Sequence, residues 1–263
     1  MDVNRPRQIT ETAQALDKAA REASAIPQLT KTWSLSIEDA YAVQAAANGL
    51  RLERGEKRVG VKLGFTSRAK MAQMGVRDLV WGCLTDQMLV ADGGSIDKSA
   101  YIHPRVESEV AFLLRRPLAG SVTLAEAMSS VEAVAPALEI IDSRYVDFKF
   151  SLADVIADNC SSAGFVVGAW RTPRFDYSNL GLVMEFNGRP VQIGSTAAIL
   201  GHPARSLVEA ARLTAAAGEQ IEAGWIVMAG AVTVAEELRP GLHAQCCMEA
   251  LGSVSFSVQY RER

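Results

Sequence analysis

The first part of the chain has the hydrophobic pattern of helices. Residues 8–24 and 36–55 are rich in alanine, and their apolar positions recur at the spacing of one helix face. Ser36 followed by Asp39 resembles an N-terminal capping pattern, and Gly55 is a plausible helix end. The pattern therefore predicts two helices before the rest of the chain begins.

From about residue 59 the pattern changes to short apolar runs separated by Gly and Pro, which is typical of strands. The candidate strands are VGVKLGF, VESEVAFLL, VAPALEIID, GFVVGAW, GLVMEFNG, WIVMAGAV and AQCCMEALGSVSFSVQY. The pair NG at 187–188 predicts a hairpin turn, and residues 204–218 predict one more helix. We expect an α+β fold, with a helical N-terminal cap at 1–57 and a β-rich catalytic core at 58–263.

One predicted strand, HPRVESEVAFLL at 103–114, carries two acidic residues on one face. Alternation at period two places Glu107 and Glu109 on the same side, where their carboxylates can converge. Such neighbours repel and raise each other's pKa unless a positive charge joins them. Glu139, inside another apolar run, offers a third carboxylate. Three hard oxygen ligands suit Mg²⁺ or Mn²⁺, whereas a solvated sheet face is the alternative interpretation.

Composition narrows the classes of protein. The chain of 263 residues is 49% hydrophobic and 22% charged, which indicates a globular protein with a substantial core. Its net charge of −3 favours neither nucleic acid nor an anionic membrane as partner. The polar start is not typical of a signal peptide, and no apolar run reaches the roughly 20 residues of a membrane span. For want of a signal peptide or membrane span, we expect a cytoplasmic protein. The four cysteines contain no C-x-x-C pair, so the sequence does not suggest a zinc site.

Several short segments occur in an order that resembles a known family. They are GVKLGFTSRAKMAQMGV, WGCLTDQM, IHPRVESEVAFLL, ALEIIDSRYVDFKF, VIADNCSSAGFVVG, ILGHPARSLVEAARL and ALGSVSF. The series resembles the 4-oxalocrotonate decarboxylase and 2-keto-4-pentenoate hydratase family, within the wider fumarylacetoacetate-hydrolase-like superfamily. The resemblance covers roughly residues 10–258. It implies a small helical region on a mixed β-sandwich or β-roll core of the fumarylacetoacetate-hydrolase C-terminal-domain type.

The resemblance also implies a metal site and a reaction. Glu107, Glu109 and Glu139 take the positions that hold Mg²⁺ or Mn²⁺ in that family. The segments TSRAKMAQMGV, LTDQM and IDSRYVDFKFSLADVIADN are most similar to the decarboxylases of meta-cleavage aromatic degradation. The implied reaction is decarboxylation of the dicarboxylic 2-oxo acid 2-oxohex-3-enedioate, or a close analogue, to 2-hydroxypenta-2,4-dienoate.

Two other functions stay open at this point. A hydratase acting on 2-hydroxypenta-2,4-dienoate would use the same metal with a positioned water. A weakly active homologue could instead serve as a complex partner. The resemblance further implies a homo-oligomer and a complex with a homologous hydratase.

Lys62 and Asp86 are the candidate catalytic residues. Lys62 lies between Val61 and Leu63, and a strand lysine of this kind often extends its ammonium to water. The resemblance implies instead that Lys62 contacts a substrate carboxylate or oxo oxygen and delivers a proton to the dienolate. Asp86 would orient water or Lys62, with a loop-capping role as the alternative.

Arg144 is a candidate for binding a substrate carboxylate, because its guanidinium can hold one through two hydrogen bonds. An ion pair with Asp142 or Asp147 is the alternative, and Lys149 is a second candidate cation in the same segment.

Ser161 and Ser162 are candidate hydrogen-bond donors to substrate. Their alternative role is turn formation around Asp158 and Asn159. Many relatives carry Arg at the position of Gly164, so one cationic contact could differ here.

Thr233 matches a threonine in the family's G-G-[IL]-T-A-A segment, and the resemblance makes it a candidate for substrate binding. The surrounding MAGAVTVAEEL departs from the family pattern at Ala231, Val234, Glu236 and Glu237. These changes would alter the pocket, so the substituents of the substrate stay open.

Overall fold

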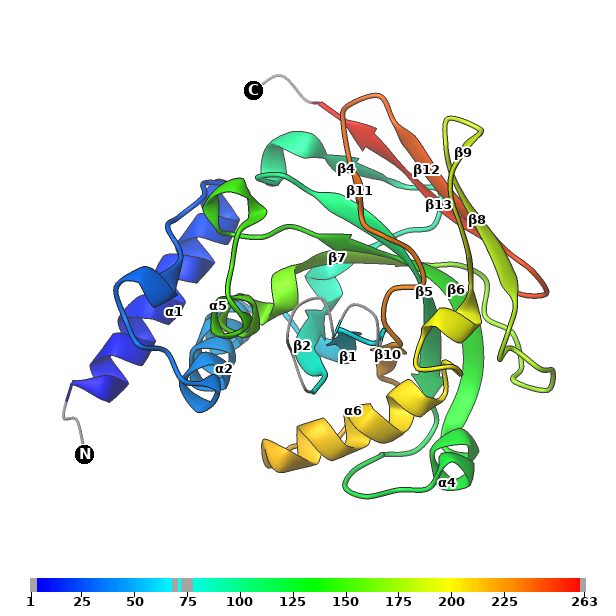
Figure 1. The fold of residues 1–263 in the computed structure, drawn as a ribbon, viewed down its shortest axis with the longest axis horizontal. Helices are drawn as coiled ribbons and strands as arrows, with labels where there is room; N and C mark the ends of the chain where they lie inside the picture. The colour runs from blue at the N-terminus through cyan, green and yellow to red at the C-terminus, as the bar shows by residue number, and fades with distance from the viewer. Residues whose placement is uncertain (1–3, 68–70, 72–77, 261–263) are drawn as a thin grey trace.

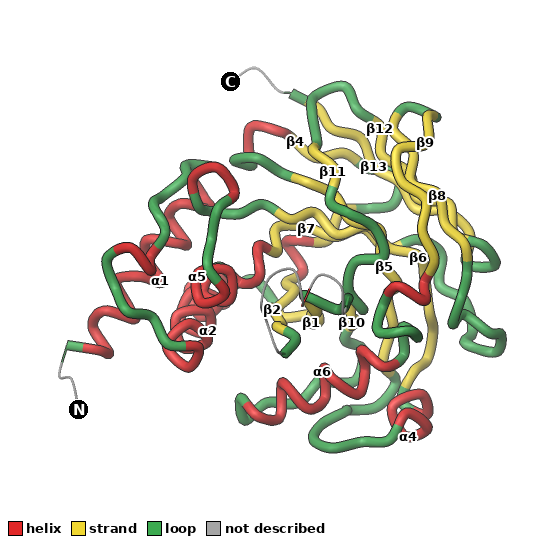
Figure 2. Tube along the Cα trace, in the orientation of Figure 1, coloured by secondary structure: helices red, strands yellow, loops and turns green. Residues whose placement is uncertain are grey.

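The computed structural model describes residues 4–67, 71 and 78–260. The family-like segment TSRAKMAQMGV, at 66–76, lies largely outside these residues. Within these described residues, two long N-terminal helices and three later ones lie beside two sheets (Figures 1 and 2). The helices are α1 (Arg5–Glu22), α2 (Ile37–Glu53), α4 (Leu124–Ser129), α5 (Leu152–Ala157) and α6 (Arg205–Ala216).

The larger sheet contains eight strands in the described residues, in the order β2-β1-β10-β5-β6-β7-β3, with β11 paired to β5. These strands are β1 (Arg58–Gly64), β2 (Val80–Thr85), β3 (Leu89–Val90), β5 (Arg105–Leu114), β6 (Val131–Ile141), β7 (Ser162–Val167), β10 (Ile226–Met228) and β11 (Glu236–Glu237). The sheet is mixed, because β1 pairs with β10 and β3 with β7 in parallel.

The larger sheet is strongly curled. Its two edge strands, β2 and β3, are separated in the chain only by the 3₁₀ turn Asp86–Met88. Such a short connection forces the two edges close together, so one face of the sheet turns inward. Buried side chains from β2, β5, β6, β7 and β10 meet on this inner face: Leu84, Ala111, Ala137, Phe165 and Met228.

The outer face of the curled sheet packs against a second sheet of five strands, ordered β4-β13-β12-β8-β9. These strands are β4 (Ser95–Asp97), β8 (Gly181–Phe186), β9 (Arg189–Ser195), β12 (His243–Met248) and β13 (Gly252–Gln259). Val110 and Phe112 of β5 join Met184, Cys246 and Phe256 in the main hydrophobic core between the sheets. Alternation along β5 therefore sends apolar residues outward into this core and the two glutamates inward.

The N-terminal helices α1 and α2 pack with α5 at one side of the curled sheet (Figure 1). Ser36 and Asp39 form the expected capping box of α2. The Asp39 N–H donates to Ser36 Oγ at 3.1 Å, and the Ser36 N–H donates to the Asp39 side chain. Gln44 of α2 donates to the carbonyl oxygens of Trp81 and Ile156 at 3.0 and 2.9 Å. No helix among the described residues is long and apolar enough to cross a bilayer.

The pattern-based expectations are largely met. The expected helix at 204–218 is α6, and the NG pair lies in the β8–β9 hairpin with positive φ at Asn187 and Gly188. The expected α+β fold is confirmed. The division into a cap at 1–57 and a core at 58–263 stays a prediction. The sequence pattern did not predict strands β2, β3, β4 and β11 or the short helices α4 and α5.

Candidate metal centre

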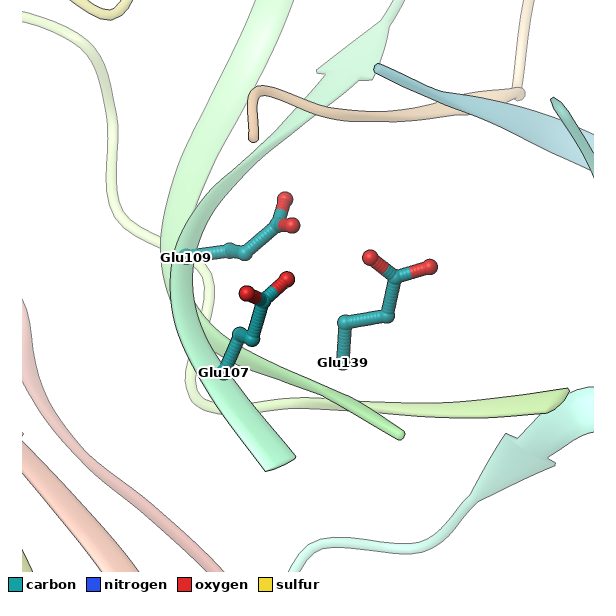
Figure 3. Close-up of side chains that lie close together, drawn as sticks. All are labelled: Glu107, Glu109 and Glu139. Atoms are coloured by element: carbon teal, nitrogen blue, oxygen red, sulfur yellow. The ribbon is translucent and has the colours of Figure 1, made fainter. Parts of the chain in front are cut away.

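The structure brings Glu107, Glu109 and Glu139 together on the inner face of the curled sheet. Glu107 pairs directly with Glu139 across the antiparallel β5–β6 ladder, and Glu109 lies two residues further along β5. One carboxylate oxygen from each residue lies within 4.8 Å of the others. Figure 3 shows the three carboxylates pointing into a shared space.

Burial makes this carboxylate group electrostatically costly. Glu109 and Glu139 are fully buried. Burial, followed by repulsion from Glu139, raises the pKa of Glu109 well above its ordinary value. Burial also raises the pKa of Glu139, although attraction to Lys62 partly opposes this effect. The cluster therefore holds negative charge that the protein alone does not fully compensate.

Lys62 lies at the edge of this cluster, on β1. Its Nζ is 3.1 Å from Glu139 Oε2 and donates to the carbonyl oxygen of Cys160 at 3.0 Å. Burial acts to lower the pKa of Lys62, but attraction to Glu139 and the neighbouring acidic groups outweighs it and raises that pKa. Lys62 is therefore a buried ammonium that can donate hydrogen bonds, rather than a lysine reaching to water.

Gly230 orients the carboxylate of Glu109. The Gly230 N–H donates to Glu109 Oε2 at 2.8 Å. Gly230 has φ +106°, and a Cβ there would lie 2.1 Å from Thr66 Oγ1. Glycine is thus required both by the backbone conformation and by the close approach of Thr66.

The donor set fits a divalent cation. Glu109 Oε1 and Glu139 Oε1 are buried and have no hydrogen-bond partner among the described residues. Buried carboxylate oxygens are normally satisfied, so such atoms indicate a missing ligand. Hard oxygen donors without Cys or His favour Mg²⁺-like ions over zinc. Glu107, Glu109 and Glu139 would hold such an ion.

A cavity of about 160 Å³ opens next to the carboxylates. Its polar lining comes from Lys62, Thr66, Glu107 and Ser161. Its apolar walls are formed by Leu63, Phe65, Val80, Ile141, Phe148, Phe150, Val155 and Ala231. A small ligand in this cavity would thus meet Glu107, the Lys62 ammonium and aromatic side chains.

Of the two candidate serines, only Ser161 lines this cavity. The Ser161 hydroxyl is buried and has no hydrogen-bond partner among the described residues, so it is available to a ligand. Ser162 is also buried, but it lines a separate cavity of about 30 Å³ beside Asn48 and the N-terminal helices. Ser162 is thus not among the residues that line the cavity beside the carboxylates, and its substrate contact stays a prediction.

Arg144 makes structural contacts within the chain. Its side chain is buried and pairs with Asp158, not with Asp142 or Asp147 as the alternative suggested. The guanidinium also donates to the backbone carbonyl oxygens of Asp142 and Asp158. These contacts favour a structural role, and the substrate contact of Arg144 stays a prediction.

Asp86 and Lys149 also lie away from the carboxylates. Asp86 Oδ1 accepts a hydrogen bond from the Lys57 N–H at 2.9 Å, at the opposite end of β1 from Lys62. This contact matches the loop-capping alternative, and the catalytic role of Asp86 stays a prediction. Lys149 is exposed and lies 3.5 Å from Asp147.

The segment around Thr233 runs beside β5. Thr233 Oγ1 accepts a hydrogen bond from the Ser108 N–H at 3.4 Å, and its substrate contact stays a prediction. Ala231 does line the cavity, so this departure from the family pattern reaches the site. Val234 is 62% exposed, and Glu236 accepts a hydrogen bond from Gln192, so neither lies in the cavity lining.

Sequence reasoning missed three contributors to the site. They are the Cys160 carbonyl, the Gly230 N–H and the aromatic pair Phe148–Phe150. The first two are backbone groups, and the amino-acid sequence does not indicate which backbone groups reach a site. For the two phenylalanines, the F-K-F spacing was the one indication in the sequence.

Comparison with known proteins defines the class and then the family. The fold and site are those of a fumarylacetoacetate-hydrolase-like α+β protein, and residues 57–259 match the model of the fumarylacetoacetate (FAA) hydrolase C-terminal family. The chain belongs to this family. The superfamily expected from the sequence segments is thereby confirmed.

A decarboxylase relative is more similar in sequence to this chain than a hydratase relative is. Over 249 residues, the chain is 58% identical to a 4-oxalocrotonate decarboxylase from Pseudomonas sp., covering 95% of this chain and 97% of the relative. A 2-keto-4-pentenoate hydratase from Paraburkholderia xenovorans (strain LB400) is 35% identical, covering 95% and 94%. The solved 4-oxalocrotonate decarboxylase from Pseudomonas putida G7, complexed with magnesium and adipate, has 39% identity and a TM-score of 0.94, covering 96% and 98%.

Proposed function

We propose that this protein is a divalent-cation-dependent decarboxylase that converts 2-oxohex-3-enedioate, or a close analogue, to 2-hydroxypenta-2,4-dienoate and CO₂. The carrying observation is the convergence of three carboxylates beside the buried ammonium of Lys62, next to a cavity that Lys62 and Glu107 line. Similarity favours the decarboxylase over the hydratase, at 58% against 35% identity.

The reaction needs a sink for electrons. When the C5–C6 bond breaks, its electron pair forms a C4–C5 double bond, the C3–C4 double bond shifts to C2–C3, and charge reaches the 2-oxo oxygen. A divalent cation held by Glu107, Glu109 and Glu139 would supply Lewis-acid stabilisation of that charge. Protonation of the oxygen then gives the dienol product.

Lys62 is suited to act on the same oxygen or on the neighbouring carboxylate. Its raised pKa keeps it protonated, so it acts as a hydrogen-bond and proton donor rather than as a base. Its position 3.1 Å from Glu139 keeps the ammonium beside the carboxylate cluster. Ser161 offers a second, neutral donor from the cavity wall.

The apolar walls support loss of CO₂. Phe148, Phe150 and Val155 are among the apolar side chains that line the cavity. A carboxylate in such surroundings is poorly solvated, whereas the CO₂ that leaves is neutral.

Product identification tests the proposal. Purified protein is incubated with 2-oxohex-3-enedioate, with Mg²⁺, with Mn²⁺ and with a chelator. We expect CO₂ and 2-hydroxypenta-2,4-dienoate in both metal reactions and neither in the chelated one. Hydration of added 2-hydroxypenta-2,4-dienoate without CO₂ release from the oxo acid would assign the hydratase instead.

The proposed assembly is tested separately. We propose a cytoplasmic homo-oligomer that also associates with a homologous hydratase. Light scattering of the purified chain tests whether it forms a homo-oligomer, and co-purification with a co-expressed hydratase tests the complex. A scaffold without activity would bind the partner but show no metal-dependent turnover.

A further inference from the structure

The turn that precedes β7 has an unusual backbone. Asn159, Cys160 and Ser161 have φ values of 48°, 53° and 58°, so three consecutive residues with side chains adopt the left-handed conformation. This conformation is disfavoured for residues that carry a Cβ. Such a run persists only where the surrounding structure determines it, and it is often found at functional sites.

The side chain of Asn159 fixes this turn to β2. Its Oδ1 accepts from the Cys83 N–H at 2.8 Å, and its Nδ2 donates to the Cys83 carbonyl oxygen at 2.9 Å. The amide thus pairs with one residue of β2 as a neighbouring strand would. Asn48 of α2 adds a third bond, from its Nδ2 to Asn159 Oδ1 at 3.2 Å.

Gly82 lets the turn approach β2 this closely. A Cβ at Gly82 would lie 2.7 Å from the Asn159 carbonyl oxygen and 3.1 Å from Asn159 Oδ1. In the β1–β2 ladder, Gly82 is the direct partner of Lys62. The turn is therefore held over the point of the sheet where Lys62 originates.

The same turn delivers two groups to the site. The Cys160 carbonyl accepts the Lys62 hydrogen bond at 3.0 Å, and the unpartnered Ser161 hydroxyl lines the cavity. Lys62 Nζ is thus fixed between a neutral acceptor on the turn and the charged Glu139 at 3.1 Å. Without the turn, Glu139 would be the remaining contact of Lys62 Nζ among the described residues.

We propose that Asn159 is a positioning residue for Lys62, acting through the Cys160 carbonyl and supported from α2 by Asn48. This inference rests on the proposed function of Lys62. It means that the N-terminal helices help to set the geometry of the active site, although they carry none of its proposed catalytic residues.

Two variants test the proposal from different directions. Asn159→Ala removes the amide that fixes the turn, whereas Gly82→Ala leaves Asn159 intact and pushes the turn from β2. We expect each to lower kcat about 10- to 100-fold, the effect of a misplacement near 1 Å, with KM and Mg²⁺ affinity within about threefold of wild type. Thr196→Val is the control, because it removes two buried hydrogen bonds, one accepted from the Leu180 N–H and one donated to the Tyr177 carbonyl oxygen, neither of which involves the turn or β2. It should lower stability and leave kcat unchanged.

A double-mutant cycle separates positioning from general damage. If Asn159 acts through Lys62, Asn159→Ala should change the residual turnover of Lys62→Ala by less than about twofold. Equal fold-losses in both backgrounds would overturn the proposal, as would loss of kcat in Thr196→Val matching that in Asn159→Ala.

A crystal structure of Asn159→Ala gives a readout that does not depend on activity. We expect the distance from Lys62 Nζ to the Cys160 carbonyl oxygen to exceed hydrogen-bond range. Retention of that contact would overturn the positioning role. If wild-type protein releases no CO₂ with any metal, the proposed decarboxylase fails, while this structure still decides whether Asn159 places Lys62.

Discussion

Glu107 and Glu139 lie directly opposite each other in the antiparallel β5–β6 pair. Like charges in this relationship destabilise a sheet, because the two side chains start from closely spaced backbone positions. Here Glu109 adds a third carboxylate, and Lys62 contacts Glu139. One ammonium cannot balance three carboxylates. The register of these two strands therefore creates a binding site for added positive charge.

A bound divalent cation should stabilise the folded protein. At a Mg²⁺ concentration about 100 times Kd, the free energy of unfolding should rise by about 2.7 kcal/mol. Glu107→Gln should lose most of this gain, because it removes one charged ligand. Thermal unfolding with Mg²⁺ and with chelator measures the difference. Glu132→Gln, on the exposed side of β6, is the control and should respond as wild type does. An unchanged Mg²⁺ response in Glu107→Gln would remove Glu107 from the site.

The metal-free protein should become less stable as pH rises. Burial and repulsion from Glu139 raise the pKa of Glu109 well above its ordinary 4.5. The folded state then holds a proton that the unfolded state has lost, so stability falls from about pH 4.5 upward, through the raised pKa. Glu109→Gln should therefore stabilise the metal-free protein at about pH 8 and have little effect at about pH 4.5. Denaturant unfolding with chelator at both pH values tests this sign.

Glu109→Gln should have the opposite effect once Mg²⁺ is added, because it removes a metal ligand. A variant that is less stable than wild type at the higher pH without metal would contradict the electrostatic argument.

Lys62 should matter more for turnover than for metal binding. Lys62→Met keeps much of the side-chain volume but removes the ammonium that contacts Glu139 and the Cys160 carbonyl. We expect kcat to fall about 10²- to 10⁴-fold, the range for losing a positioned proton donor. Mg²⁺ affinity, measured by calorimetry, should change far less. Lys57→Met, which alters an exposed lysine just before β1, is the control. Collapse of metal binding with normal turnover at saturating Mg²⁺ would refute the role of Lys62.

The sequence revealed those parts of the site that depend on local pattern. Alternation along a strand is a local property, so the shared face of Glu107 and Glu109 could be read directly. The meeting with Glu139 depends on the register of β5 and β6. That register has no local signature and entered through the family resemblance.

Residues whose partners come from distant segments were harder to assign. The guanidinium of Arg144 was expected near substrate or near Asp142 or Asp147, but the fold brings Asp158 to it. The sequence indicated a turn around Asp158 and Asn159, but not three consecutive left-handed residues, because no glycine marks the run. Tertiary contacts determine both features.

The Arg144–Asp158 pair should determine stability and not substrate affinity. Arg144→Met leaves a buried carboxylate without its partner, so we expect a loss of about 3–5 kcal/mol in the free energy of unfolding. Adding Asp158→Asn should recover part of that loss, because it removes the uncompensated charge. Denaturant unfolding measures both effects. KM for the oxo acid in the folded fraction should remain at the wild-type value. A large rise in KM without loss of stability would support Arg144 as a substrate contact.

Gly230→Ala should weaken metal binding through the orientation of Glu109. The added Cβ would lie 2.1 Å from Thr66 Oγ1, so the Gly230 N–H must move away from Glu109 Oε2. Losing such a contact to a metal ligand typically lowers metal affinity about 10- to 100-fold. Gly224→Ala is the matched control, since it has φ +82° but no atom within 4 Å of its added Cβ. Both variants should lose stability from backbone strain, whereas only Gly230→Ala should lose Mg²⁺ affinity in a calorimetric titration. Equal affinity in the two variants would show that Glu109 does not depend on Gly230 for its orientation.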